Sequence, residues 1–288
     1  MSLPAPGALL RALRPRQWMK NVLVGAAPVA AGGLDDGEVL GRTIAAVAVF
    51  IAAAGATYLV NDAADVDIDR THPTKRNRPI ASGAVSVPQA RGTAALLAVA
   101  ALAGAAALHW SYLVIIAIYL AINAWYSGGM KHIPVLELGA IASGFILRAI
   151  GGGAATRIPL SAWFVVVVCS ASLFVVAGKR SAELRRTADK GAGRPVLTHY
   201  TPAGLRAFRA VTAGTAVVAY ALWVLDQDLA IGWLAALSLL PFAGALARYS
   251  AAIERGLGED PEDIVLGDRP FQLIGLCWLV VYGVGLYG

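Results

Sequence analysis

The chain has 288 residues and a formal net charge of +6 at pH 7; 58% of its residues are hydrophobic and 15% are charged. Its mean hydropathy is +0.64, whereas soluble domains usually carry about 25% charged residues. This composition excludes an ordinary soluble protein and indicates an integral membrane protein, and no sequence motif points to nucleic acid.

Nine apolar runs, each long enough to cross a bilayer, predict an all-α integral membrane protein with nine transmembrane helices. The first run contains Pro28, and the fifth contains Arg148 and Gly151–Gly153, so these two have the weakest signal. No linker or internal repeat interrupts the chain, and we expect a single domain over residues 1–288. The predicted spans are 17–34, 40–60, 87–108, 111–128, 134–153, 160–178, 204–225, 229–247 and 271–287.

Basic residues are distributed unevenly among the loops that join these spans. If the N-terminus is cytoplasmic, every Lys and Arg except Arg42, Arg148 and Arg157 lies on the cytoplasmic side. Inner loops of membrane proteins carry such an excess of basic residues. We therefore expect a multi-pass protein of the inner (plasma) membrane, with its N-terminus and its long loops in the cytoplasm.

The second span ends in an acidic segment, Asn61 to Arg70, with four aspartates in eight residues. At about 100° per residue, Asp62, Asp65 and Asp69 fall on one face of a helix, whereas Asp67 points elsewhere. Carboxylates this close together repel one another unless a cation binds them. Mg²⁺ prefers oxygen ligands and usually binds through carboxylates together with substrate phosphates. The segment therefore predicts a Mg²⁺ site for a phosphorylated substrate.

A basic segment follows directly, with His72, Lys75, Arg76 and Arg78 within seven residues. Lys and Arg beside metal ligands are typical of a diphosphate site, because they neutralise the negative charge of the phosphates that the metal does not neutralise. The alternative is that these cations set the membrane topology and bind anionic lipid. His72 is expected either to contact the substrate or to hold the turn before Pro73.

Charged residues also lie within and at the end of later spans. Arg148 is inside the fifth span, where a charged side chain is costly and usually marks a pathway or a partner; the alternative is snorkelling to the outer surface. At the exit of the sixth span, Lys179, Arg180 and Glu183 share a helical face, and they either complete an anion site or anchor the helix. The acidic residues between 254 and 268 are expected to form a solvated loop; the alternative is that one of them binds a metal ion or the ribose of the donor.

Taken together and in this order, these segments resemble the UbiA-type intramembrane prenyltransferase superfamily. The resemblance covers nearly the whole chain. It implies a UbiA-like bundle of nine helices around a central cavity, with a cytoplasmic polar cap over a diphosphate held by Mg²⁺. The matching segments are Arg14-Pro15-Arg16-Gln17-Trp18-Met19-Lys20-Asn21, Asn61-Asp62-x-x-Asp65-x-x-x-Asp69, His72-Pro73-x-Lys75-x-x-Arg78-Pro79-Ile80-x-Ser82-Gly83, Tyr126-Ser127 with Lys131, and Arg148.

One position departs from the superfamily pattern. Typical members carry a second Asp-x-x-x-Asp motif after the sixth span, whereas this chain has Lys179-Arg180-x-x-Glu183 there. This form resembles the branch that transfers a phosphoribosyl group from 5-phosphoribosyl-1-diphosphate to decaprenyl (polyprenyl) phosphate, an early step toward arabinan cell-wall precursors. The resemblance therefore implies a Mg²⁺-dependent transferase that releases diphosphate.

The resemblance also implies roles for individual side chains. Asp62, Asp65 and Asp69 are the expected metal ligands, with Asn61 as a further ligand or an orienting donor. Lys20 is expected to bind the lipid phosphate. The other residues expected to bind the substrates are His72, Lys75, Arg78, Tyr126, Lys131, Arg148, Lys179, Arg180, Glu183, Arg185 and Arg186.

Two other functions stay open. A prenyltransferase that moves an isoprenyl chain from its diphosphate onto an aromatic or quinone-precursor acceptor shares the acidic motif, but Lys179 and Arg180 in place of carboxylates argue against it. A small membrane transporter places its ionisable residues near the bilayer midplane in matching halves. In this sequence the ionisable residues lie mainly on the predicted cytoplasmic side. The Gly-rich spans suit close helix packing, either within the bundle or in a homo-oligomer.

Overall fold

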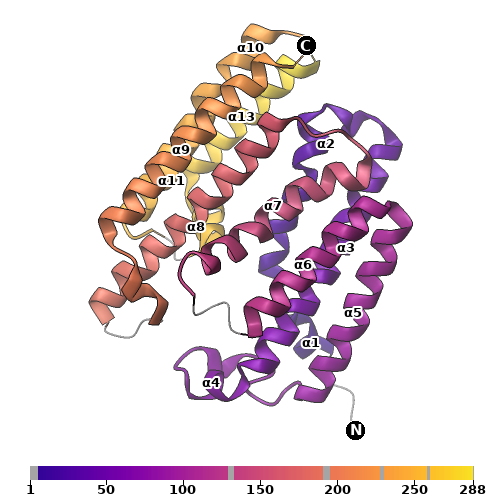
Figure 1. The fold of residues 1–288 in the computed structure, drawn as a ribbon, viewed down its shortest axis with the longest axis vertical. Coiled ribbons are helices and arrows are strands. Elements are labelled where there is room, and N and C mark those ends of the chain that lie inside the picture. Colours follow the sequence, from indigo (N-terminus) through magenta and orange to yellow (C-terminus); the bar gives the residue numbers. More distant parts are fainter. Residues whose placement is uncertain (1–5, 129–132, 191–194, 228–229, 258–259, 288) are drawn as a thin grey trace. The chain divides into compact units, whose positions relative to one another are not determined.

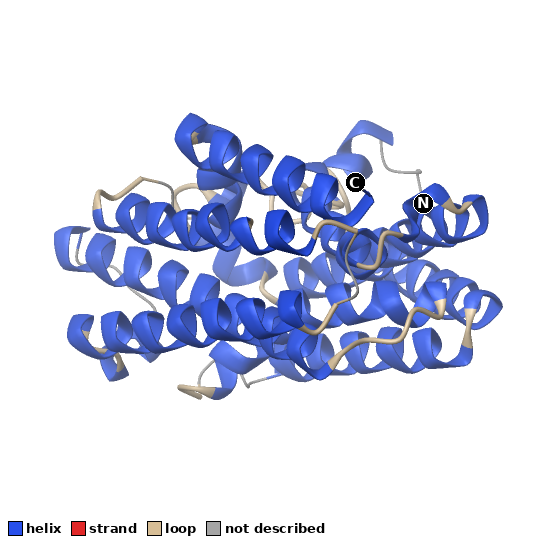
Figure 2. Ribbon diagram, turned by 90° about the horizontal axis from the view of Figure 1, so that it is seen from above, coloured by secondary structure: helices blue, strands red, loops and turns tan. Residues whose placement is uncertain are grey.

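The computed structural model describes residues 6–128, 133–190, 195–227, 230–257 and 260–287. Over these ranges the chain is helical, with turns and short connections and with no strand (Figure 2). The predicted all-α class is therefore confirmed.

Eight helical segments are long and apolar enough to cross a membrane, counted over the described residues (Figure 1). They correspond to the second through ninth predicted spans; most ends differ by a few residues, whereas α8 and α11 continue well beyond the predicted ends at 178 and 247. They are α3 (Gly37–Ala64), α5 (Val87–Leu108), α6 (Trp110–Gly128), α7 (Leu136–Thr156), α8 (Ala162–Lys190), α9 (Pro202–Leu225), α10 (Gly232–Leu237) with α11 (Leu239–Glu254), and α13 (Arg269–Tyr287).

The first predicted span, 17–34, is not a continuous α-helix, and eight of the nine predicted spans form candidate membrane-spanning helices within the described part of the chain. The short helix α1 (Pro6–Ala12) precedes the segment, which forms the 3₁₀ helix η1 (Pro15–Gly25), the short helix α2 (Ala26–Ala30) and the 3₁₀ turn η2 (Gly33–Asp35). Proline removes a backbone N–H from the helical ladder, and Gly32 adopts the left-handed conformation at φ 67° that ends α2.

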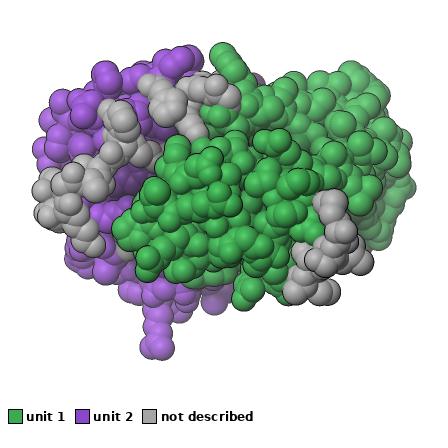
Figure 3. Space-filling view, turned by 90° about the horizontal axis from the view of Figure 1, so that it is seen from below, with its two compact units in different colours: residues 1–131, 147–159 green, residues 132–146, 160–288 purple. Residues whose placement is uncertain are grey.

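The chain divides into two compact units, shown in green and purple in Figure 3. Unit 1 contains residues 1–131 and 147–159, and unit 2 contains residues 132–146 and 160–288, so that α7 contributes to both. The single domain expected from the sequence stays a prediction.

The core of unit 1 forms around α3, whose small residues allow α5 and α6 to pack closely against it. Phe50 of α3 contacts the ring of Tyr119 edge to face at 5.4 Å, and the hydroxyl of Tyr112 donates to the carbonyl of Ala46 at 2.7 Å. These contacts fix the two helices that carry the acidic segment and the Tyr126-Ser127 pair.

The core of unit 2 forms where α8, α9 and α11 pack against one another. Phe174 of α8 lies 5.4 Å from the ring of Tyr249 on α11, and Tyr220 of α9 stacks on Phe242 of α11 at 4.3 Å. The cytoplasmic connection predicted between the last two spans contains α12 (Pro261–Gly267), which begins with a capping box between Asp260 and Asp263.

Candidate functional site

Two aspartates of the acidic segment are brought together through one arginine. Asp62 is 3% exposed and Asp69 is 1% exposed. The Nη1 group of Arg78 donates to Asp62 Oδ1 at 3.1 Å and to Asp69 Oδ2 at 2.7 Å. Arg14 Nη2 donates to Asp62 Oδ1 at 2.5 Å, and Lys75 Nζ lies 4.0 Å from Asp69 Oδ1. We call Asp62, Asp69, Arg14, Arg78 and Lys75 the acid–base cluster.

The local fold explains this arrangement. The helix α3 ends at Ala64, and Asp65 links it to the short helix α4 (Val66–Thr71), which turns Asp69 back toward Asp62. The following 3₁₀ turn η3 (Lys75–Asn77) then carries Arg78 into the same space. Asp67 points outward and pairs with the exposed Arg70 at 3.1 Å, as the helical spacing predicted for it.

Asn61 connects the end of α3 to the end of α6. Its side-chain oxygen accepts a hydrogen bond from the hydroxyl of Ser127, which also contacts the carbonyl of Asn123 at 2.8 Å. Tyr126 is partly buried beside Ser127. Lys131, another predicted ligand, lies outside the described residues.

The fit of this region to Mg²⁺ rests on its oxygen donors. Among the described residues, no three His, Cys, Asp or Glu side chains lie close enough together to hold one metal ion. Asp62 and Asp69 do meet through Arg78, and Mg²⁺ commonly uses one or two carboxylates, with phosphates and water completing its shell. The donor chemistry therefore suits Mg²⁺, and the larger ligand set with Asp65 and Asn61 stays a prediction.

His72 takes a structural position in the turn before η3. Its Nδ1 atom lies 3.3 Å from the backbone nitrogen of Thr74 and 3.4 Å from that of Lys75, and both nitrogens donate to it. Of the two roles expected for His72, this geometry supports the turn.

Arg148 is buried inside unit 1, at 4% exposure, which excludes snorkelling. Its Nε donates to Asn21 Oδ1 at 2.8 Å and its Nη2 to the hydroxyl of Tyr119 at 3.3 Å. The guanidinium also lies over the rings of Tyr119 and Phe50, at 5.1 and 5.4 Å. Asn21 was not among the predicted site residues, and its position directly after Lys20 in the N-terminal motif was the available signal.

Arg180 is fully buried in unit 2 between two carboxylates. Its Nε and Nη2 donate to Glu137 at the start of α7, with Nη2 at 2.6 Å from Oε2, and its Nη1 donates to Glu183. This contact with Glu183 agrees with the predicted shared face. The guanidinium is enclosed, however, so the geometry gives Arg180 a structural role. Glu137 was missed, although a lone carboxylate beginning an apolar run was a visible signal.

The neighbouring cations of α8 contact the end of α11 and the segment that follows it. Lys179 Nζ contacts Asp260 Oδ1 at 2.6 Å, and Arg185 Nη1 donates to the carbonyl oxygens of Ile253 and Glu254 at 3.2 and 2.5 Å. Arg186 is exposed.

The acidic residues between 254 and 268 are not simply solvated, which corrects that expectation. Asp260 pairs with Lys179, and Asp268 accepts two hydrogen bonds from Arg248 at 3.0 and 2.6 Å. The hydrogen bonds from Arg248, with one from the backbone of Phe271, hold the pKa of Asp268 below its usual value. These ion pairs fasten the segment to α8 and α11.

Comparison with protein families matches the UbiA prenyltransferase family over residues 21–263. This range includes the acid–base cluster except Arg14, and it extends through α8 and α11.

Curated proteins similar to the chain match it over nearly its full length. Decaprenyl-phosphate phosphoribosyltransferase of Mycobacterium tuberculosis (strain ATCC 25618 / H37Rv) is 45% identical over 283 residues, which are 96% of this chain and 94% of that protein. The protein of the same name from Corynebacterium glutamicum is 42% identical over 289 residues, which are 97% of this chain and 86% of that protein.

Solved structures share the fold at low sequence identity. A UbiA homolog from Archaeoglobus fulgidus, bound to GPP and Mg²⁺, has a TM-score of 0.73 and 17% identity, and the match covers 98% of this chain and 100% of that one. A digeranylgeranylglyceryl phosphate synthase has a TM-score of 0.67 and 17% identity, with 97% of both chains covered. These matches show a UbiA-like fold.

Proposed function

The chain belongs to the UbiA prenyltransferase family, and we propose that within this family it is a phosphoribosyltransferase. It transfers the 5-phosphoribosyl group of 5-phosphoribosyl-1-diphosphate to decaprenyl phosphate and releases diphosphate. The observation that carries the proposal is 42–45% identity, over 96–97% of the chain, to proteins named decaprenyl-phosphate phosphoribosyltransferase.

The reaction breaks the bond between ribose C1 and the diphosphate oxygen and forms a bond from C1 to an oxygen of the lipid phosphate. The diphosphate leaves with the bonding electrons, so negative charge grows on it while positive charge develops on the ribose. The lipid phosphate is already an anion at pH 7, and the reaction requires no general base. The protein must therefore orient two phosphorylated substrates and stabilise the leaving diphosphate.

Within unit 1, the acid–base cluster supplies the groups for the leaving diphosphate. Arg78 is held by Asp62 and Asp69, and Arg14 and Lys75 bring two more cations to the same carboxylates. We assign the three cations to the diphosphate oxygens. Asp62 and Asp69, with Asp65 and Asn61 as further predicted ligands, would hold Mg²⁺, which when bound neutralises charge on the leaving group.

The other substrate contacts are assigned from the sequence motifs. Lys20 lies in η1 and is proposed to bind the phosphate of the lipid. Residues that stay predicted ligands are Tyr126, Lys131, Arg148, Lys179, Glu183, Arg185 and Arg186. Arg180 is not proposed as a ligand, because Glu137 and Glu183 enclose its guanidinium.

We further propose nine membrane crossings in one domain, with the N-terminus and the acid–base cluster at the cytoplasmic side. At about 2.0 Å per residue in η1 and 1.5 Å in α2, the segment Pro15–Ala30 reaches roughly 30 Å, which is the thickness of the hydrocarbon core. It therefore supplies a ninth crossing without a continuous α-helix. The distribution of Lys and Arg supports the orientation.

A transfer assay tests this function. Purified protein receives radiolabelled 5-phosphoribosyl-1-diphosphate, decaprenyl phosphate and Mg²⁺, and label is counted in the organic phase. We expect transfer that depends on the lipid and disappears with EDTA. Turnover of a prenyl diphosphate with an aromatic acceptor, in the absence of phosphoribosyl transfer, would contradict the proposal.

A further inference from the structure

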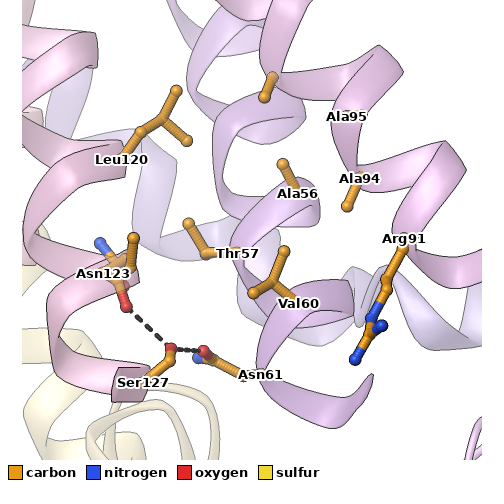
Figure 4. A pocket seen from close by; sticks show the side chains of 12 residues that line it. Ala56, Thr57, Val60, Asn61, Arg91, Ala94, Ala95, Leu120, Asn123 and Ser127 are labelled. Carbon is orange, nitrogen blue, oxygen red and sulfur yellow. Dashed lines mark hydrogen bonds between the residues drawn. The ribbon is translucent and has the colours of Figure 1, made fainter. Parts of the chain in front are cut away.

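A pocket of about 290 Å³ opens between α3, α5 and α6 of unit 1 (Figure 4). It shares only Asn61 with the predicted metal and substrate ligands. Its wall is mainly apolar, and its lining residues from α3 are Ala56, Thr57, Val60 and Asn61; those from α5 are Arg91, Ala94, Ala95 and Ala98; those from α6 are Leu120, Asn123, Ala124 and Ser127.

The pocket has a polar end and an apolar end. Asn61 and Ser127 lie close to the last residues of α3 and α6, and Arg91 lies in the second turn of α5, so the three side chains are at one end in Figure 4. Leu120 and Ala98 lie about two turns away from that end on their helices. A ligand that fills the pocket therefore places its polar group where these helices begin or end and its apolar part along the spans.

Arg91 is the one charged group in the lining. The hydroxyl of Ser127 donates a hydrogen bond to the side-chain oxygen of Asn61, and the amide of Asn123 donates to the carbonyl of Tyr119 at 2.8 Å. Arg91 is exposed, and within the described part of the chain it makes no hydrogen bond or ion pair. Its guanidinium donors are thus available to an anion at the polar end, where membrane phosphate groups lie.

From this geometry we propose that the pocket binds one anionic phospholipid of the surrounding membrane. Its phosphate contacts Arg91, and one acyl chain lies along Val60, Ala95 and Leu120. Val60 is 41% exposed and Ala95 is also exposed, so the chain enters from outside the helices.

The acid–base cluster lies on another side of α3 than Val60, and Asn61 is the one lining residue that also belongs to the predicted metal ligands. At about 100° per residue, Val60 and Asp62 point roughly 160° apart around the helix. A phosphate at Arg91 therefore does not share the side of α3 that carries Asp62. This direction favours a lipid of the membrane over the phosphorylated lipid substrate as the occupant.

Lipid binding, rather than activity, tests the proposal and keeps it independent of the transfer reaction. Delipidated full-length protein in neutral detergent is titrated with phosphatidylglycerol or phosphatidylcholine, and bound lipid is resolved by native mass spectrometry. We expect the first phosphatidylglycerol to bind about fivefold more tightly than phosphatidylcholine, because one basic residue favours an anionic headgroup by that order. Arg91→Gln should remove this preference, and Ala95→Leu should weaken binding of both lipids by filling the pocket.

Two control variants make the test specific. Arg206→Gln removes an exposed arginine near the start of α9, and Ala107→Leu enlarges an exposed alanine of α5 outside the pocket; both should bind lipid as the wild type does. Equal affinity for the two lipids in the wild type, or an unchanged preference in Arg91→Gln, would overturn the proposal. One-for-one displacement of phosphatidylglycerol by decaprenyl phosphate would also overturn it, since the pocket would then belong to the lipid substrate.

Discussion

Asp62 and Asp69 are almost completely buried, and both carboxylates form ion pairs with Arg78. A buried carboxylate without a partner is costly, so each arginine in the acid–base cluster stabilises the fold in addition to the role proposed for it at the diphosphate. Arg78 matters most, because one of its nitrogens contacts both carboxylates.

Replacing Arg78 tests its proposed role in the transfer reaction. Arg78→Ala should lower the transfer rate by about 100-fold, the order seen when one donor to a developing oxyanion is removed. Arg78→Lys keeps the positive charge but loses the planar set of guanidinium donors, so its transfer rate should lie between those of Arg78→Ala and the wild type. Arg70→Gln is the control, because Arg70 is exposed and pairs with the exposed Asp67. Equal rates in all three variants would remove Arg78 from the site.

The Glu137–Arg180–Glu183 group predicts a loss of stability. Glu137→Gln leaves the buried Arg180 short of charge compensation, and breaking a buried pair costs about 3–5 kcal/mol. Lys179→Gln disrupts only the partly exposed pair with Asp260, which is worth about 1 kcal/mol or less. Thermal unfolding should show a much lower midpoint for Glu137→Gln than for Lys179→Gln. Equal midpoints would contradict the structural role of Arg180.

At the scale of elements, α7 and η1 approach each other closely at Gly152. A Cβ atom there would lie 1.8 Å from the carbonyl oxygen of Val24, closer than any real contact. Nearby, Arg148 of α7 donates to Asn21 of η1, so the same approach positions a predicted substrate ligand.

This close approach predicts opposite effects for two glycines of α7. Gly152→Ala should force η1 away and lower the midpoint of thermal unfolding. Gly139→Ala has open space around the new methyl group and should stabilise the helix by up to about 1 kcal/mol. If both variants unfold at the same temperature, α7 and η1 do not pack as described.

Sequence patterns predicted the helices better than the contacts between side chains that are far apart in the sequence. Hydropathy located α5 at 87–108, because a membrane helix requires one long apolar run. It did not reveal the 3₁₀ form of η1, because hydropathy does not distinguish 3₁₀ turns from α-helical turns. The pairs Arg148–Asn21 and Arg180–Glu137 join residues 127 and 43 positions apart, and no local pattern indicates such contacts. Asp62, Asp69 and Arg78 were predicted because motif spacing along the chain is itself informative.

For the whole molecule, the path of the N-terminal segment determines the number of crossings. If Pro15–Ala30 crosses the membrane, residues 2 and 82 lie on the same side, and residue 161 lies on the other. A membrane-impermeant thiol reagent reports the side of the membrane on which an introduced cysteine lies. The test uses Ser2→Cys, Ser82→Cys and Ser161→Cys, each in a chain with Cys169 and Cys277 replaced. Labelling of residues 2 and 82 from opposite sides would show that the segment does not cross.

Asp69→Asn tests whether the acid–base cluster serves phosphoribosyl transfer. Asparagine keeps the size of the buried side chain and removes its charge. Phosphoribosyl transfer to decaprenyl phosphate is measured over a range of Mg²⁺ concentrations. The midpoint of thermal unfolding, measured without the lipid substrate, verifies that the variant is folded. We expect a folded protein whose transfer rate falls at least about 100-fold and whose transfer requires a higher Mg²⁺ concentration. A folded Asp69→Asn protein with the wild-type rate and the wild-type Mg²⁺ dependence would contradict it.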